Sequence, residues 1–166
     1  MLSEVLSKEN CAECRFCCSF RRCSLWETPL FSDEAVEKLE KANEYGVTGV
    51  FKDRQPVLEN NYKTDDPEEE VPCTFLDKNK GCILSPEDKP FDCSIWPLRV
   101  MEKGSQLVIA LTPTCSALGQ TPGTALSELV CEKGLGSRIF EYAKTHRYII
   151  KKYKEGYPVI MYRTGF

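Results

Sequence analysis

Apolar residues recur at helical spacing in three stretches of the chain. The first covers residues 32–46, where Ser32 predicts the N-cap and Gly46 predicts the end of the helix. The second covers residues 124–132, and the third runs from Ser137 to Lys154 with one apolar face. We therefore predict three helices, two of them near the C-terminus.

Shorter apolar runs separated by turn residues predict strands. Residues 73–84 form two such runs around a turn that contains Asn79 and Gly81, which is typical of a hairpin. A second hairpin is predicted for residues 98–111, with its turn at residues 103–105. Residues 158–162 predict a last strand. Short hairpins with helices predict an α+β fold class.

Two segments lack periodicity. Residues 1–31 carry five cysteines, and we expect a short helix or turn followed by a loop that metal coordination shapes. Residues 65–70, DDPEEE, predict a solvated acidic loop. The length of 166 residues favours one domain over residues 1–166, with residues 120–166 as a mainly helical C-terminal extension. The domain is thus predicted to be organised by metal and buttressed by about three helices.

Charge and hydropathy limit the function classes. The net charge of −3 argues against nucleic acid as a partner. No apolar run approaches the length needed to span a membrane, and the N-terminus lacks the basic start and apolar stretch of a signal peptide. These observations predict a cytoplasmic protein, where thiols stay reduced or bind metal, although an unconventional export route stays open.

Cysteine is the most informative residue type. The chain has ten cysteines, and four of them fall in the segment CAECRFCC. Its C-x2-C-x2-C spacing allows three sulfur atoms to converge on one metal centre. Eight cysteines lie in predicted loops, turns or hairpin ends, which makes them candidate metal ligands. They are Cys11, Cys14, Cys17, Cys18, Cys73, Cys82, Cys93 and Cys115.

Eight thiols can form two four-ligand sites, one multinuclear site, or one four-cysteine site with spare thiols. Adjacent side chains on extended backbone point in opposite directions, so we expect Cys17 and Cys18 to face two centres or different corners of a cluster. Four thiolates leave the same net charge around Zn²⁺ as around an iron–sulfur core of charge +2. Charge therefore does not separate zinc from an iron–sulfur cluster.

Other cysteines and the single histidine have different expectations. Disulfides or free thiols are the alternative to metal. Cys131, beside Leu129 and Val130 in a predicted helix, is expected to be a buried structural thiol. Cys23 follows two arginines, which would lower the pKa of its thiol if they pointed inward. His146 is expected to pack on the apolar side of the last helix, with ligation and catalysis as alternatives.

The segments CAECRFCC, CTFLDKNKGCIL, KPFDCSIWPL and TPTCSALG resemble the YkgJ-type, or CxxCxxCC, cysteine-cluster family. This family is described as zinc- or iron-chelating and is often named as Fe–S oxidoreductases. The resemblance spans about residues 11–119. Lys89 and Ser94 stand where the family commonly has arginines, and Leu84 replaces its usual tyrosine. The matching residues are Cys11, Cys14, Cys17, Cys18, Cys73, Phe75, Leu76, Gly81, Cys82, Ile83, Pro90, Cys93, Pro97 and Cys115.

The leading functional expectation is an iron–sulfur cluster, such as a 4Fe–4S cluster, held by up to eight cysteines. It would serve redox or group-transfer chemistry with a protein or redox partner. The alternative is a zinc protein without catalysis, whose metal is structural and which binds a partner or handles metal. No nucleotide-binding or metalloprotease motif is present, so the sequence names no catalytic residue and leaves enzymatic activity open.

Overall fold

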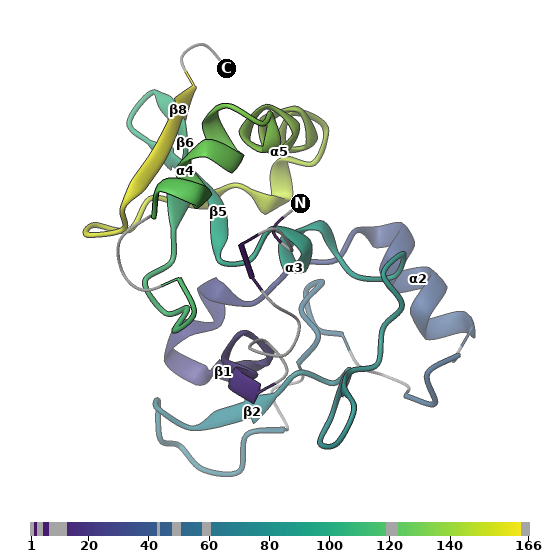
Figure 1. The fold of residues 1–166 in the computed structure, drawn as a ribbon. Coiled ribbons are helices and arrows are strands. Elements are labelled where there is room, and N and C mark those ends of the chain that lie inside the picture. Colours follow the sequence, from purple (N-terminus) through teal and green to yellow (C-terminus); the bar gives the residue numbers. More distant parts are fainter. Residues whose placement is uncertain are drawn as a thin grey trace. The chain divides into compact units, whose positions relative to one another are not determined.

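The computed structural model describes residues 2, 5–6, 13–42, 44–47, 51–57, 61–118 and 123–163. The chain forms two compact units (Figure 1). Unit 1 comprises residues 1–14 and 95–166, and unit 2 comprises residues 15–94. Helices and several small sheets occur together, so the predicted α+β class is confirmed.

Unit 1 contains a four-stranded sheet with strand order β7-β5-β6-β8. The central strands form the predicted hairpin, paired from Leu98 with Leu111 to Lys103 with Gln106. Its turn uses Gly104 at φ 63°, a left-handed conformation that glycine adopts without steric cost. The strands are β5 (Leu98–Lys103), β6 (Gln106–Leu111), β7 (Lys151–Lys152) and β8 (Val159–Arg163).

Two helices of unit 1 pack beside this sheet, α4 against β8 and α5 against β5 (Figure 1). The helix α4 (Thr124–Cys131) matches its prediction closely. The helix α5 (Leu135–Thr145) ends nine residues before the predicted Lys154, so the C-terminal part of that prediction is wrong. The chain instead forms the 3₁₀ turn η5 (Arg147–Ile149) and then β7, which pairs in parallel with β5. The helical periodicity of this segment gave no sign of β5, which offers it a partner for strand pairing.

The core of unit 1 lies between the sheet and its helices. Strand β6 reads as a continuous apolar run, and Val108, Ile109 and Ala110 are each 0% exposed. A strand covered on both faces is expected to show such a run rather than alternation. Ile139 and Ala143 of α5 are also fully buried. Unit 1 thus has an extended apolar core.

Unit 2 is built from shorter elements. The predicted hairpin at residues 73–84 is confirmed, although its two strands are only two residues long each. The pairing of β1 with β2, from Ser19 with Pro72 to Arg21 with Glu70, was not predicted. The elements are η2 (Phe16–Cys18), β1 (Ser19–Arg21), η3 (Arg22–Glu27), α2 (Asp33–Ala42), β2 (Glu70–Pro72), β3 (Leu76–Asp77) and β4 (Gly81–Cys82).

The helices α2 and α3 (Phe91–Ile95) differ in how well the sequence predicted them. The Ser32 side chain accepts a hydrogen bond from the Ala35 amide at 3.2 Å, so α2 begins at the predicted cap. It ends at Ala42, four residues before Gly46. The short helix α3 lies in a segment for which we predicted no helix.

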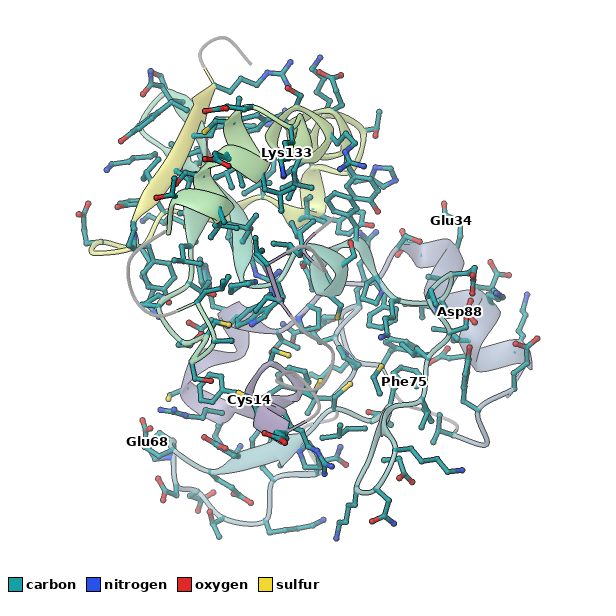
Figure 2. The ribbon with its side chains drawn as sticks, viewed as in Figure 1. Cys14, Glu34, Glu68, Phe75, Asp88 and Lys133 are labelled. Atoms are coloured by element: carbon teal, nitrogen blue, oxygen red, sulfur yellow. The ribbon has the colours of Figure 1, made fainter. Side chains whose placement is uncertain are left out.

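Unit 2 has two small apolar clusters in place of one core. Phe75 is 1% exposed and packs with Phe31 in the first cluster (Figure 2). Phe20 and Tyr62 belong to the second. Cys73 packs against both clusters, which places this thiol at the centre of the unit.

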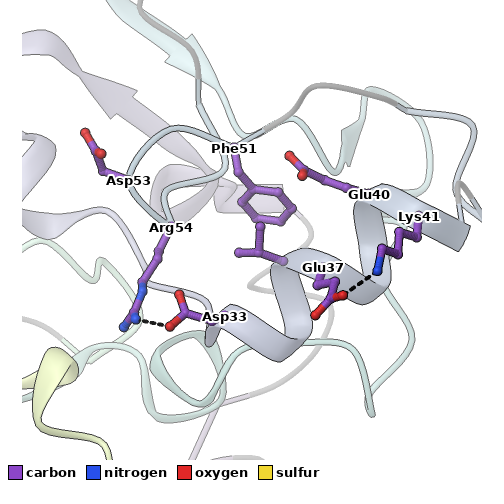
Figure 3. A pocket seen from close by; sticks show the side chains of 8 residues that line it. Asp33, Glu37, Glu40, Lys41, Phe51, Asp53 and Arg54 are labelled. Atoms are coloured by element: carbon purple, nitrogen blue, oxygen red, sulfur yellow. Dashed lines mark hydrogen bonds and ion pairs between the residues drawn. The ribbon is translucent and has the colours of Figure 1, made fainter.

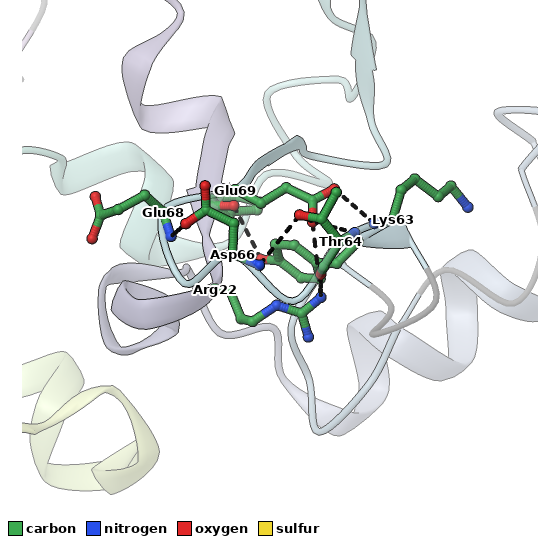
Figure 4. Close-up of polar contacts among 8 residues, drawn as sticks. Arg22, Lys63, Thr64, Asp66, Glu68 and Glu69 are labelled. Carbon is green, nitrogen blue, oxygen red and sulfur yellow. Dashed lines mark hydrogen bonds and ion pairs between the residues drawn. The ribbon is translucent and has the colours of Figure 1, made fainter.

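The acidic loop is mostly exposed, as predicted, but its glutamates also organise the backbone (Figure 4). The Glu69 carboxylate accepts hydrogen bonds from the amides of Lys63 at 2.6 Å and Thr64 at 2.8 Å. Arg21 pairs with Glu68 and Glu70 across the β1–β2 pair. These contacts connect the loop to the segment that follows the cysteine motif.

Candidate metal centre

The structure distributes the eight candidate cysteines between the two units. Cys11 lies outside the described residues. Cys14 and Cys115 belong to unit 1. The remaining five belong to unit 2, and they are Cys17, Cys18, Cys73, Cys82 and Cys93. None of the nine described cysteines forms a disulfide.

Cys17 and Cys18 point the same way, contrary to the expectation that this adjacent pair faces in two directions. Their Sγ atoms are 4.0 Å apart. The expectation assumed extended backbone, but both residues lie in the 3₁₀ turn η2. Arg15 starts this turn in the left-handed conformation, at φ 49°, and the Cys18 amide donates to its carbonyl at 3.0 Å. Successive side chains in such a turn are about 120° apart, not the 180° of a strand.

Cys73 lies against this pair. Its amide donates to the Cys18 carbonyl at 2.7 Å, which fixes the backbone of one cysteine segment on the other. Burial raises the pKa of the Cys73 thiol to about 12. The nearby thiols of Cys82 and Cys17 are smaller causes of this raised pKa, because each would place a like charge beside Cys73. The thiols of Cys17 and Cys82 therefore influence the ionisation of the Cys73 thiol.

Cys82 reaches the same region through the hairpin. It pairs with Leu76 across β3 and β4, and the Leu76 amide donates to the Cys73 carbonyl at 2.9 Å. The next residue, Ile83, donates its amide to the Phe75 carbonyl at 2.9 Å. The side chain of Cys82 is exposed. The hairpin thus links the half-buried Cys73 to a thiol at the surface.

The unit 1 cysteines come together in part. The Ser116 hydroxyl lies 3.5 Å from the Cys14 Sγ atom, so Cys14 lies beside the loop that carries Cys115. Cys14 is exposed and Cys115 is half-buried. In unit 2, Cys93 lies in α3 with its amide donating to the Pro90 carbonyl at 3.0 Å, and its side chain is exposed.

Within the described residues, no three Cys, His, Asp or Glu side chains converge closely enough to form a complete metal site. The Cys17–Cys18 separation of 4.0 Å nevertheless matches one edge of a tetrahedral site. Zn–S bonds of about 2.3 Å place two sulfur ligands about 3.8 Å apart. A cysteine Sγ atom moves by about 3 Å between staggered rotamers, so side-chain rotation changes how closely nearby thiols approach that edge.

Three other residues differ from their expectations or lie apart. Cys131 is exposed, and the prediction of a buried thiol is wrong because its neighbours Leu129 and Val130 occupy the buried face of α4. A hydrogen bond to Glu68 raises the pKa of the Cys23 thiol, opposite to the expected effect of the arginines. His146 stacks on Tyr142 with ring centroids 3.9 Å apart, which supports the packing role.

A groove of about 570 Å³ lies along α2 (Figure 3). Two of its carboxylates are already in ion pairs, Asp33 with Arg54 and Glu37 with Lys41. None of its lining residues is a cysteine or a histidine. The lining residues are Asp33, Val36, Glu37, Glu40, Lys41, Phe51, Asp53 and Arg54. The candidate metal centre therefore rests on the thiols and not on this groove.

Sequence reasoning missed one residue of the centre, Arg15. It lies between Cys14 and Cys17, and its left-handed backbone starts the turn that aligns the next two cysteines. Arginine seldom adopts this conformation, so the residue type gives no signal for it.

Comparison with known proteins adds no further assignment. No protein-family model, curated protein or solved structure matches the chain. Across the described part of the chain, the structure contains no helix that is both long and apolar enough to cross a membrane. The argument for function therefore rests on the cysteines themselves.

Proposed function

We propose that this protein binds a metal centre through thiolates and that Cys17, Cys18, Cys73 and Cys82 of unit 2 are ligands. The observation that carries the proposal is the 4.0 Å separation of the Cys17 and Cys18 sulfur atoms, in a turn that the Cys73 amide holds at 2.7 Å. Four thiols from two distant segments then lie in one small region.

The electrostatics of Cys73 determine how a metal would bind. A half-buried thiol among other thiols stays protonated at neutral pH, because ionisation would leave uncompensated negative charge. A bound cation reverses this preference, since thiolates must be deprotonated to coordinate metal. Metal binding at this site is therefore expected to release protons and to become tighter as pH rises.

Two forms of the proposal differ in the metal. The C-x2-C-x2-C spacing and the family resemblance favour an iron–sulfur cluster, with Cys93 as a further candidate ligand in the same unit. The 4.0 Å sulfur separation favours a single tetrahedral ion such as Zn²⁺. A cluster would supply redox or group-transfer chemistry with a redox partner, whereas zinc would organise the fold or a protein-binding surface. Both forms place the protein in the reducing cytoplasm.

Anaerobic purification followed by metal and sulfide analysis tests the proposal and separates its two forms. An iron–sulfur protein is brown, contains iron and inorganic sulfide, and absorbs near 400 nm. A zinc protein is colourless and contains zinc without sulfide. Protein that contains no stoichiometric metal, and takes up neither zinc nor iron with sulfide on reconstitution, would contradict the proposal.

Cysteine-to-serine variants locate the site. Cys17→Ser, Cys18→Ser and Cys73→Ser are expected to lower metal content or affinity strongly, because each removes one thiolate ligand. Cys131→Ser is the matched control, since this thiol is exposed and donates a hydrogen bond to the backbone carbonyl of Ile160 at 3.6 Å. Equal metal content in all four variants would exclude the assigned ligands.

A further inference from the structure

Arg15 is the first residue of unit 2 and directly precedes the turn that carries Cys17 and Cys18. Its backbone is left-handed, with φ 49° and ψ 6°. This conformation is unfavourable for arginine, whereas glycine and asparagine adopt it more readily. An arginine at this position costs conformational energy.

The Arg15 guanidinium extends to the β3–β4 hairpin. Its Nη1 atom donates a hydrogen bond to the carbonyl of Lys78, in the hairpin turn. The Asp77 carboxyl, which precedes this carbonyl, has a pKa below its ordinary value because the amides of Lys80 and Asn79 donate to it, with a smaller contribution from Arg15. The guanidinium therefore lies at the end of the hairpin that carries Cys82.

The cysteine turn is thus fixed at two places. Hydrogen bonds of the backbone close the turn, from Cys18 to Arg15 at 3.0 Å, and attach it to the next segment, from Cys73 to Cys18 at 2.7 Å. The Arg15 side chain attaches the same turn to the Cys82 hairpin. Backbone contacts survive any side-chain substitution, but this last contact depends on one guanidinium. Removing it loosens the attachment of the hairpin, which is then tied to the Cys17–Cys18 pair through the Cys73 backbone.

We propose that Arg15 is a positioning residue of the metal centre, which holds the Cys82 hairpin against the Cys17–Cys18 turn through the Lys78 carbonyl. This inference rests on the proposed thiolate centre. Arg15 does not coordinate the metal itself. It sets how well the four thiols are arranged before the metal binds, so its removal weakens affinity without removing a ligand.

Arg15→Asn separates the guanidinium from the backbone, because asparagine tolerates the left-handed conformation but is too short to reach Lys78. Arg15→Lys keeps a cationic donor on a long side chain and tests rescue. Arg54→Asn is the matched control in the same unit. Arg54 is also left-handed, at φ 67°, and its guanidinium pairs with Asp33 of α2, beside the groove and not beside a cysteine.

The experiment titrates metal-free full-length protein with Co²⁺ under anaerobic conditions, follows the thiolate-to-cobalt absorption, and then displaces Co²⁺ with Zn²⁺. We expect Arg15→Asn to weaken Zn²⁺ affinity about tenfold, which is the size expected for one charge-assisted hydrogen bond. Arg15→Lys should recover most of this loss, and Arg54→Asn should match the wild type. The Arg15→Asn cobalt spectrum should also shift, because the thiolate geometry changes.

The outcomes separate this inference from the proposed function. Wild-type protein that binds neither Co²⁺ nor Zn²⁺ would overturn the thiolate centre and, with it, the role of Arg15. Wild-type binding that Arg15→Asn leaves unchanged would overturn the role of Arg15 alone. Equal weakening by Arg15→Asn and Arg54→Asn would also overturn it, because the effect would then reflect general loss of stability in unit 2. Thermal unfolding of the metal-free variants provides the parallel measure of stability.

Discussion

The two units differ in the number of apolar side chains that they bury and in the length of their strands. Among the described residues, unit 1 buries 19 apolar side chains and unit 2 buries only 8, although the two have similar lengths. Unit 1 has strands of up to six residues in one sheet, whereas unit 2 has strands of two or three residues in two separate pairs. Burial of apolar surface is the main favourable term in folding. Unit 2 therefore has far less of it available.

The two units also differ in net charge. Unit 2 contains 11 Lys and Arg against 17 Asp and Glu, whereas unit 1 contains 11 against 8. The excess of negative charge in unit 2 opposes its compact state. Coordination of a metal by its thiols would offset the small core. Five of the ten cysteines lie in unit 2 and are candidate metal ligands. The unit with the smaller apolar core therefore contains more of the candidate metal ligands.

Metal removal should give the largest effect and should act on unit 2 alone. A structural zinc site contributes about 10–16 kcal/mol in small peptides, which is comparable to the net stability of a domain. With a strong chelator, we expect amides in residues 15–31 and 73–93 to lose protection from hydrogen exchange. Amides of β5 and β6 should keep theirs because their core contains no cysteine ligand.

Hydrogen exchange measured by mass spectrometry on the full chain checks this pattern. Wild-type protein treated with an inactive analogue of the chelator is the control. Unchanged protection in residues 15–31 would show that unit 2 holds its structure without metal. Equal loss in β6 would show instead that the two units unfold together, and the comparison would then fail.

Core substitutions should affect the two units differently. Ile139→Ala removes a fully buried side chain from α5 and is expected to cost about 2–5 kcal/mol of unfolding free energy. Metal affinity should not change where the variant remains folded. Phe75→Ala removes the buried ring of unit 2 and should cost about 3–5 kcal/mol, and it should also weaken metal binding because Phe75 lies between Cys73 and Leu76.

Denaturant unfolding combined with a metal titration separates these two effects. Loss of metal affinity in Ile139→Ala at temperatures where it is folded would show that the units are energetically coupled. Retained affinity in Phe75→Ala would show that the thiols do not depend on the small core around them.

Gly136 provides a test of close packing within unit 1. A Cβ atom at this position would lie 2.4 Å from the Met161 Sδ atom and 2.8 Å from the Val130 carbonyl oxygen. Alanine normally stabilises a helix relative to glycine, but here the overlap with backbone dominates, and we expect Gly136→Ala to cost about 1–3 kcal/mol. Thermal unfolding measures the loss. Because only the Met161 overlap can relax, adding Met161→Ala should restore stability only in part, and full recovery would locate the strain in Met161 alone.

The parts of the fold that local pattern determines were predictable. The β5–β6 hairpin followed from its glycine turn, and the start of α2 followed from Ser32. The pairing of β1 with β2 was not predictable, because Arg21 and Glu70 are far apart in sequence and strands of three residues show no clear alternation. The end of α5 was missed because residues after Thr145 fit a helical face equally well until β5 offers them a pairing partner.

The candidate site likewise has features that the sequence predicted and features that it did not. The spacing of the cysteines selected the candidate thiols, and the hairpin that places Cys73 and Cys82 in one supersecondary element was predicted. The alignment of Cys17 with Cys18 was not readable, because it depends on a left-handed Arg15 that no residue preference indicates. The exposure of Cys131 was missed because one helix position separates it from the buried Val130, a rotation of about 100°.

Asp88 should give the smallest effect and a defined pH dependence in unit 2. Its carboxylate accepts hydrogen bonds from Lys38 at 2.5 Å and from the Tyr45 hydroxyl at 2.5 Å. Lys38 first and Tyr45 next hold the pKa of this carboxyl below its ordinary value of 3.8. A lowered pKa in the folded state contributes stability above pH 3.8 that is lost as the pH falls through the folded-state value.

Asp88→Asn should therefore cost about 1 kcal/mol at neutral pH, because the amide still accepts hydrogen bonds but carries no charge. The difference from the wild type should shrink below about pH 4, where the unfolded carboxyl becomes protonated. Urea unfolding at several pH values measures it, and Lys38→Met is the control because it removes the largest cause of the lowered pKa. A difference that stays constant down to pH 2 would mean that Asp88 stabilises the contact between α2 and the Ser85 turn through shape and hydrogen bonds alone. Unit 2 would then gain no stability from this charge.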